Sequence, residues 1–178
     1  MTEQVTEGDL TAAPKRALNP VVVVLALALV AALVALGLVW RGWQHQRDLA
    51  DAGDEAEAAA RSAIVAMTSY DYTSLDADFA WVDTAGTAAF RTRYADASAP
   101  IKKLILGIKA HAEGTVIASA ATVKDTDHAT VLLFVDQEIS HPGQAKQPPE
   151  QPRVTMSMVR QGGRWLVDDV EIKSLTGS

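Results

Sequence analysis

The stretch "RVTMSMVRQGGRWLVDDVEI" (Arg153–Ile172) gives the first indication of the fold. In its first half, Val154–Met158, valine and methionine alternate with polar residues, as expected for a strand with one buried face. The pair Gly162-Gly163 is a turn signal, and the β-rich run Arg164–Ile172 follows it at once. The stretch therefore predicts an antiparallel hairpin at the end of the chain.

Two further β-rich runs precede this hairpin. They are "GTVIASAATV" (Gly114–Val123) and "HATVLLFVDQEI" (His128–Ile139), separated by the turn residues Lys124–Asp127. The connection His141–Pro152 contains four prolines and no apolar run, so we expect a long loop there. Together the four runs predict four antiparallel strands.

Helical patterns occupy the chain before these strands. In Gln44–Ser69, apolar residues recur at spacings of three and four, which predicts a helix with one narrow apolar stripe. The stripe consists of Leu49, Ala52, Ala56, Ala60, Ala63 and Met67. Shorter helices are predicted at Leu75–Val82 and at Thr87–Ala97, the second with Ala88, Ala89 and Phe90 facing inward. Pro100 restarts the chain, and Ile101–Lys109 is a candidate for one or two further helical turns. Helices followed by strands indicate an α+β domain.

The run "VVVVLALALVAALVALGLVW" (Val21–Trp40) has no charged or strongly polar side chain over 20 residues. At about 1.5 Å per helical residue it matches the roughly 30 Å hydrocarbon core of a bilayer. A cleaved signal peptide would have a shorter apolar core and a small-residue cleavage site. Instead Trp40, Arg41 and Trp43 follow, residues typical of an interfacial anchor. We therefore predict an uncleaved transmembrane helix.

This run divides the chain into a membrane part and a domain. The predicted parts are a disordered cytoplasmic tail at 1–20, a transmembrane helix with its interfacial anchor at 21–43, a helical extension at 44–69 and the domain at 70–178. Two positive charges flank each end of the run, so charge does not decide its orientation in the membrane. The short polar tail favours a cytoplasmic N-terminus. The expected location is the inner (plasma) membrane, single-pass, with the C-terminal domain periplasmic or extracytoplasmic.

Composition excludes several classes of function. The chain has no cysteine, which removes disulfides, thiol catalysis and cysteine-ligated metals. The net charge of −6 argues against nucleic acid as a partner. The four histidines show no ligand spacing, and no nucleophile elbow or phosphate-binding loop occurs. We expect no catalytic residue, no metal site and no cofactor.

The last predicted strand contains two adjacent acids, Asp168 and Asp169. Neighbouring residues of a strand point to opposite faces. They therefore cannot form a paired-carboxylate site unless a β-bulge intervenes. On strict alternation, Trp165 shares a face with Asp169 and packs into the core. One acid would be solvated and the other bonded to a neighbour such as Arg160 or Arg164.

The membrane helix offers a more specific pattern. Small residues lie on one face at Ala28, Ala32 and Ala35, with Ala31 beside them. Such faces let another helix approach closely in lipid. Alanine is also frequent in any apolar run, so a packing face and a composition effect both stay open.

The order of these features resembles the Mce-associated membrane proteins of actinobacteria. The most specific parts are "TSYDYTSLDAD" (Thr68–Asp78), with Tyr70, Asp71 and Tyr72, and "RWLVDDV" (Arg164–Val170). The resemblance implies a nuclear-transport-factor-2-like (cystatin-like) domain, in which helices pack on a curved antiparallel sheet. It also implies an accessory role in Mce lipid-import systems, whose permease and Mce subunits would be the partners.

These expectations lead to three hypotheses for function. The first is a non-enzymatic accessory or stabilising subunit that docks through its transmembrane helix on the permease of a lipid transporter. The second is a membrane-tethered domain that binds a lipid or sterol in its cone. A third, weaker one is an isomerase or dehydratase, because this fold also houses enzymes. The expected inward faces are apolar, which suits acid–base chemistry poorly.

Overall fold

The computed structural model describes residues 20–143 and 148–173. The predicted cytoplasmic tail, up to residue 19, lies outside them. The chain divides into two compact units, Met1–Trp43 and Gln44–Ser178. One helix, α1 (Pro20–Thr68), contributes residues to both units.

In the N-terminal unit, the described residues are helical from Pro20 onward. Trp40 and Trp43, with 65% and 69% of their surface accessible, are exposed side chains. Among the described residues, no helix meets the length and apolarity that crossing a membrane requires. The predicted span Val21–Trp40 includes positions whose side chains lie outside the described set, and it stays a prediction. These are Val22, Val23, Ala26, Leu27 and Ala31.

The second unit combines helices with one sheet. Its further elements are β1 (Tyr70–Asp71), α2 (Leu75–Phe79), α3 (Trp81–Ala85), α4 (Ala88–Ile108), β2 (His111–Asp125), β3 (His128–Ser140), β4 (Arg153–Gln161) and β5 (Arg164–Lys173). The strands form a sheet in sequence order, and each neighbouring pair is antiparallel. The predicted α+β class is confirmed, and the four predicted strands correspond to β2–β5.

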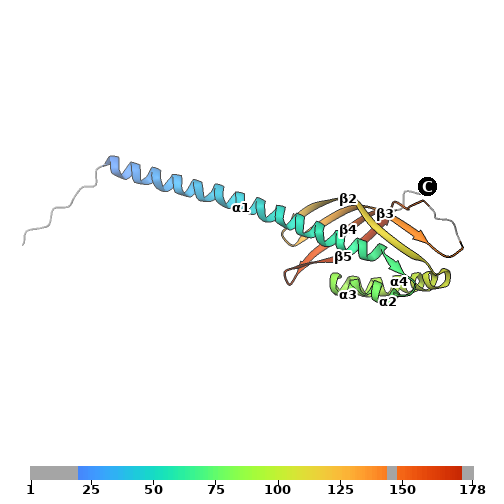
Figure 1. The fold of residues 1–178 in the computed structure, drawn as a ribbon. Coiled ribbons are helices and arrows are strands. Elements are labelled where there is room, and N and C mark those ends of the chain that lie inside the picture. Colours follow the sequence, from blue (N-terminus) through green and yellow to red (C-terminus); the bar gives the residue numbers. More distant parts are fainter. Residues whose placement is uncertain (1–19, 144–147, 174–178) are drawn as a thin grey trace, which may run out of the picture. The chain divides into compact units, whose positions relative to one another are not determined.

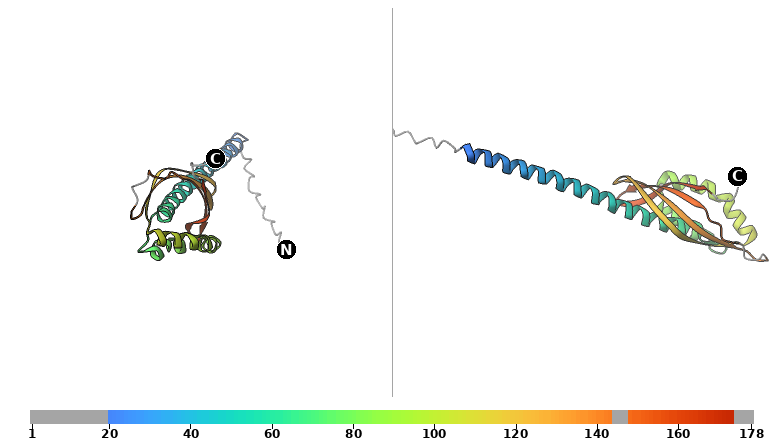
Figure 2. Two further views of the ribbon diagram at one scale, coloured as in Figure 1. Left: turned by 90° about the vertical axis from the view of Figure 1, so that its right-hand side faces the viewer. Right: turned by 90° about the horizontal axis from the view of Figure 1, so that it is seen from above.

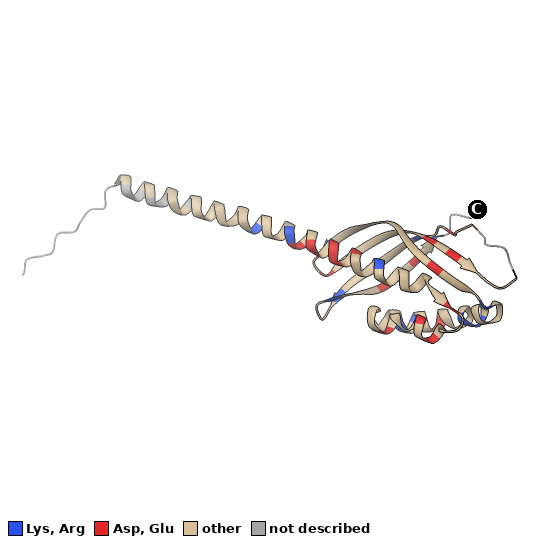
Figure 3. Ribbon diagram, viewed as in Figure 1, with Lys and Arg blue, Asp and Glu red and all other residues tan. Residues whose placement is uncertain are grey.

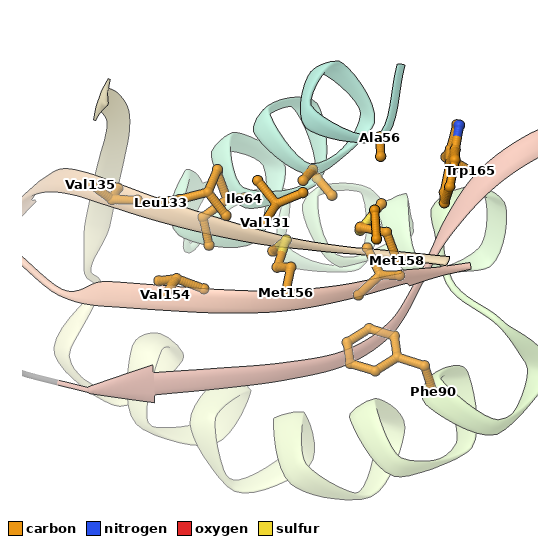
Figure 4. Packing of buried hydrophobic residues seen from close by; sticks show 14 of the residues in the cluster. Ala56, Ile64, Phe90, Val131, Leu133, Val135, Val154, Met156, Met158 and Trp165 are labelled. Atoms are coloured by element: carbon orange, nitrogen blue, oxygen red, sulfur yellow. The ribbon is translucent and has the colours of Figure 1, made fainter. Parts of the chain in front are cut away.

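The sheet curls around the C-terminal part of α1, while α4 lies beside β5 at the open side of the curl (Figures 1 and 2). Alanines on α1 make this packing possible, because Ala56 and Ala60 are completely buried against the strands. From the sheet, Val131, Leu133 and Met156 are equally buried. Figure 4 shows these side chains meeting between helix and sheet, so the core lies inside the curl.

Acidic residues gather on α1 just after Arg47 (Figure 3), and two of them bind the sheet. Glu55 accepts a hydrogen bond from the Trp165 indole nitrogen at 3.2 Å and pairs with Arg160 at 3.1 Å. Ser119 of β2 donates to Glu57. The polar flanks of the helix therefore fix its position on the sheet, while its alanines fill the core.

The end of α1 approaches β2 at a glycine. A Cβ atom added to Gly114 would lie 1.9 Å from the Thr68 hydroxyl oxygen and 2.6 Å from the Thr68 Cβ. Thr68 is itself buried and donates to the Ile64 carbonyl at 2.7 Å. This contact requires glycine for space rather than for backbone conformation.

The helices after α1 differ from the prediction in two places. Leu75–Val82, expected as one helix, divides into α2 and α3. The larger difference is that α4 continues through Pro100, where we expected the chain to restart. Although proline removes one helical hydrogen bond, Ile105 is buried with Leu75 and Phe79 in a second cluster. Tertiary packing thus holds the C-terminal half of α4 in place.

Candidate functional site

A cavity of about 430 Å³ lies between the end of α1, α4 and β5, inside the second unit. Most of its lining is apolar: Met67, Tyr70, Phe79, Phe90, Tyr94, Ala97, Ile101, Val170 and Ile172. The polar residues of the lining are Thr68, Arg93, Ser98, Gln137 and Asp169. This composition is typical of sites for small apolar molecules, which combine apolar walls with a few placed polar groups.

Aromatic rings form one wall of the cavity. The ring centroids of Phe79 and Tyr94 are 6.1 Å apart, and those of Phe90 and Tyr94 are 5.7 Å apart. Trp81 stands edge-on to Tyr94 at 5.2 Å and donates from its indole nitrogen to the Tyr94 hydroxyl at 3.3 Å. The Tyr94 ring is thereby fixed from both sides.

A β-bulge shapes the opposite wall. Ser157 of β4 pairs with Asp169, but Met158 pairs with Val167, so Asp168 is the extra residue. After this bulge Val170, rather than Asp169, shares a face with the buried Met156, because directly opposed residues lie on the same side of a sheet. Strict alternation, which placed Asp169 with Trp165 and Val167, is therefore wrong beyond Asp168. Trp165 itself is buried in the main cluster.

The two aspartates bind α4 and not the arginines that we expected. Thr87, whose hydroxyl accepts from the Phe90 amide as the N-cap of α4, donates to Asp168 at 2.9 Å. Arg93 donates to the Asp168 carbonyl at 2.6 Å and pairs with the Asp169 carboxylate at 3.4 Å. Both aspartates thus attach the helix to the strand at the cavity edge.

Burial changes the acidity of both cavity tyrosines. It raises the pKa of Tyr70 and of Tyr94 above the ordinary phenol value, and the nearby Glu150 charge adds to the rise for Tyr70. Both phenols are therefore neutral at physiological pH and can act as hydrogen-bond donors.

The cavity offers little for acid–base chemistry. Its described lining includes no histidine, and the carboxylate of Asp169 is paired with Arg93. The hydroxyl proton of Ser98 goes to the Ala95 carbonyl at 3.2 Å. Within residues 20–143 and 148–173, no group of three or more acids and histidines could hold a metal ion. What this arrangement can do is enclose an apolar molecule.

The motif Thr68–Asp78 contributes to the cavity only in part. Tyr70 lines it, whereas Tyr72 packs on the second cluster. Asp71 organises the turn that follows: it accepts from the Thr73 amide at 2.7 Å and lies 3.1 Å from His111. These hydrogen bonds, led by that from the Thr73 hydroxyl, lower the pKa of Asp71. Its role here is to fix the chain between β1 and α2.

An exposed apolar stripe lies on the C-terminal half of α4. Ile101, Leu104 and Ile108 are 50%, 62% and 43% exposed and follow one another at helical spacing. Ile101 also lines the cavity, so the stripe begins at its mouth. Lys103 and Lys109, both exposed, form no ion pair with the described residues.

The sequence indicates this site only in part. The pair Tyr70 and Tyr72, with Asp71, is a candidate either to line a cavity or to close a helix end over the core, and Tyr70 lines the cavity. Of the three residues expected to face inward on the helix Thr87–Ala97, Phe90 is buried, whereas Ala88 and Ala89 are exposed. The run "PIKKLILGI" (Pro100–Ile108) does carry a signal, because it has more apolar residues than one buried face needs.

In the N-terminal unit, the structure places Ala28, Ala32 and Ala35 on the surface of α1. The side chain of Ala31 lies outside the described residues. Arg41, between the two tryptophans, is exposed as well. The predicted packing face and interfacial anchor are accessible in the single chain, and both stay predictions.

Comparison with known sequences gives one family. The family model described as "Uncharacterized protein Rv1363c/MT1408-like" matches residues 17–173. The uncharacterized protein Rv1363c of Mycobacterium tuberculosis (strain ATCC 25618 / H37Rv) is 27% identical over 131 residues, which are 72% of this chain and 50% of that protein. The chain therefore spans about half the length of this curated relative.

Solved structures with the same fold come from type IV secretion systems. An IcmL-like protein of Legionella pneumophila subsp. pneumophila str. Philadelphia 1 has a TM-score of 0.60 at 13% identity, covering 68% of this chain and 92% of that one. The periplasmic domain of DotI has a TM-score of 0.55 at 12% identity, covering 65% and 90%. CagV, a VirB8 homolog of Helicobacter pylori strain 26695, has a TM-score of 0.53 at 18% identity, covering 67% and 100%. These likenesses show the α+β fold with a curled antiparallel sheet, as in nuclear-transport-factor-2-like domains.

Proposed function

The chain belongs to the Rv1363c/MT1408-like family, and from this premise we propose that it is a non-enzymatic subunit of a membrane protein assembly. The observation that carries the proposal is the exposed apolar stripe of Ile101, Leu104 and Ile108 on α4. Exposed apolar surface of this kind marks protein interaction sites. Beside it, Lys103 and Lys109 are exposed and have no ion-pair partner among the described residues, which favours a partner surface that carries acidic groups.

Anchoring is the second part of the proposal. The run Val21–Trp40 crosses the inner membrane once, with the N-terminus in the cytoplasm and the domain on the other side. This topology agrees with the DotI structure, which is that of a periplasmic domain. The small residues Ala28, Ala32 and Ala35 form the face that packs on the partner.

The finer proposal concerns the identity of the assembly. The motifs around Tyr70 and Trp165 that resemble Mce-associated proteins support an Mce lipid-import system, with its permease and Mce subunits as partners. The structural neighbours belong to secretion systems, and they support only the coarser role of a component of an envelope assembly.

Two variants test the proposal in native membranes. The first replaces Ala28, Ala32 and Ala35 with leucine, and the second replaces Leu104 and Ile108 with serine. Each should reduce the membrane proteins that co-purify with the tagged chain after detergent extraction, because each removes a contact surface. A variant with Ala88 and Ala89 replaced by serine changes exposed residues outside both surfaces and is the control. Unchanged recovery with both test variants would contradict the docking surfaces.

A second candidate function is a membrane-tethered lipid- or sterol-binding domain. The cavity of about 430 Å³ and its aromatic wall favour it. Its volume lies at the lower end of the roughly 300–1,000 Å³ range of ligand sites, which suits one apolar chain or a sterol-sized body. The two candidates are compatible, because the stripe and the cavity share only Ile101, whereas Leu104 and Ile108 lie outside the cavity lining.

A further inference from the structure

We infer that the cavity between α4 and β5 binds an uncharged amphiphile, one apolar chain ending in a hydroxyl or carbonyl group, and that it discriminates against the corresponding anion. This inference rests on the second candidate function and names the ligand class of that site. It does not depend on the docking surfaces proposed for assembly.

The apolar body of the ligand has a defined place. Phe79, Phe90 and Tyr94 line one wall, and Val170 lies on the other. At the mouth Ile101 and Ile172 are 50% and 56% exposed. A bound chain would remove this apolar surface from water, which contributes about 25 cal/mol per Å² of buried area.

Two residues of the cavity lining, Tyr94 and Gln137, have polar groups that can still form a hydrogen bond. Tyr94 accepts from Trp81, and among the described residues its own hydroxyl proton has no acceptor. Gln137 donates from its amide nitrogen to the Thr68 carbonyl at 2.9 Å, which leaves its amide oxygen as an acceptor. A ligand hydroxyl can therefore accept from the phenol of Tyr94 or donate to the amide oxygen of Gln137.

Tyr94 and Gln137 are both partly exposed, and both line the cavity. The threonine and serine of the lining differ, because Thr68 and Ser98 donate to the carbonyls of their own helices.

Charge decides between a neutral and an anionic head group. Arg93 is the cation of the lining, and its guanidinium pairs with Asp169 at 3.4 Å and donates to the Asp168 carbonyl at 2.6 Å. A ligand carboxylate beside this ion pair would gain attraction from Arg93 and meet repulsion from Asp169. The nearby Glu150, whose charge acts on Tyr70, adds further repulsion.

Desolvation acts in the same direction. An anion that enters an apolar cavity loses its hydration, and this free-energy cost is offset only by a hydrogen-bonded cation that has no other counter-charge. Here Arg93 already has the Asp169 carboxylate as its counter-charge. A neutral hydroxyl loses far less hydration and finds both a donor and an acceptor, so the neutral ligand binds more tightly.

To test this inference, the full-length protein is incubated with an equimolar mixture of oleyl alcohol and oleate, which have the same hydrocarbon chain and differ in the head group. Native mass spectrometry of the protein in detergent micelles at neutral pH measures the two adducts. We expect at least about tenfold more alcohol adduct than oleate adduct, equivalent to about 1.4 kcal/mol. Replacing Asp169 with asparagine leaves Arg93 uncompensated and should narrow the ratio severalfold through a larger oleate adduct.

Two tryptophan variants identify binding in the cavity. Ala97→Trp fills the cavity from an exposed position of α4 and should remove the adducts. Ala88→Trp places the same side chain on α4 outside the lining and should leave them unchanged. If neither lipid binds, or Ala97→Trp leaves the adducts intact, the second candidate function fails with the inference. If both lipids bind equally and Ala97→Trp removes both, the binding function holds and the preference for an uncharged head is overturned.

Discussion

At the residue scale, Gly114 and Thr68 fix the distance between α1 and the sheet. The side chain of Thr68 occupies the space where Gly114 has no Cβ, and its hydroxyl proton is held by the Ile64 carbonyl. Gln137 donates to the Thr68 backbone from β3. One small residue therefore determines how closely the helix end approaches, and with it the floor of the cavity, which Thr68 lines.

Substituting Gly114 with alanine should destabilise the fold by about 1–3 kcal/mol, the usual cost of overpacking, because the new methyl group meets Thr68. Gly107→Ala is the matched control, since nothing lies within 4 Å of its added Cβ and it occupies α4. That variant should gain up to about 1 kcal/mol from helix propensity. Urea unfolding measures both. Equal stability of the two variants would refute the steric argument.

The lowered pKa of Asp71 predicts a pH dependence. A carboxylate whose folded-state pKa lies below its ordinary value of 3.8 stabilises the fold above that pH, and the contribution disappears as the pH falls through the lowered value. Asp71→Asn should therefore cost stability well above pH 3.8 and cost less in strong acid. Unfolding free energies of both proteins across this window test it. A cost that does not vary with pH would indicate that the charge plays no part.

At the scale of elements, the alanine stripe of α1 lets a sheet close around a helix. Ala52, Ala56, Ala60 and Ala63 are each almost or fully buried, as the spacing of three and four predicts. Ile64 belongs to the same surface and was not included in the predicted stripe. Short side chains bring helix and strands close together, and the larger residues come from the sheet.

Lengthening one of these alanines should therefore disturb the packing. Ala56→Leu forces three extra carbon atoms into the core and should lower the free energy of unfolding by about 1–3 kcal/mol. Ala58→Leu adds the same atoms on the exposed side of the same helix and should change it little. Thermal unfolding followed by circular dichroism compares them. Comparable losses of stability in the two variants would show that Ala56 does not face the core.

Most of the helices and strands could be predicted from the sequence, because the period-two pattern of strands and the helical pattern of apolar residues are local. The strands β2–β5 and the stripe of α1 follow from such patterns. The continuation of α4 through Pro100 could not be predicted, since it depends on Ile105 packing against Leu75 and Phe79. The bulge at Asp168 was foreseen only as an exception, because a bulge depends on pairing with β4.

At the scale of the whole molecule, the cavity exists only after α1, α4 and β5 have come together. The sequence pointed to a cavity only at Tyr70, because the lining is drawn from segments that are far apart in the sequence. The family match covers residues 17–173, and the fold of the domain is similar to that of solved proteins from type IV secretion systems. The proposed role as a subunit depends on two surfaces, the apolar run Val21–Trp40 and the stripe on α4.

The measurement that tests this role most directly is affinity purification of the tagged wild-type chain from native membranes after chemical cross-linking in cells. Mass spectrometry then identifies and quantifies the proteins recovered. We expect the same integral membrane proteins in every preparation, in fixed proportion to the tagged chain, and reduced recovery when Leu104 and Ile108 are replaced with serine. Repeated recovery of the chain alone would contradict the proposed role.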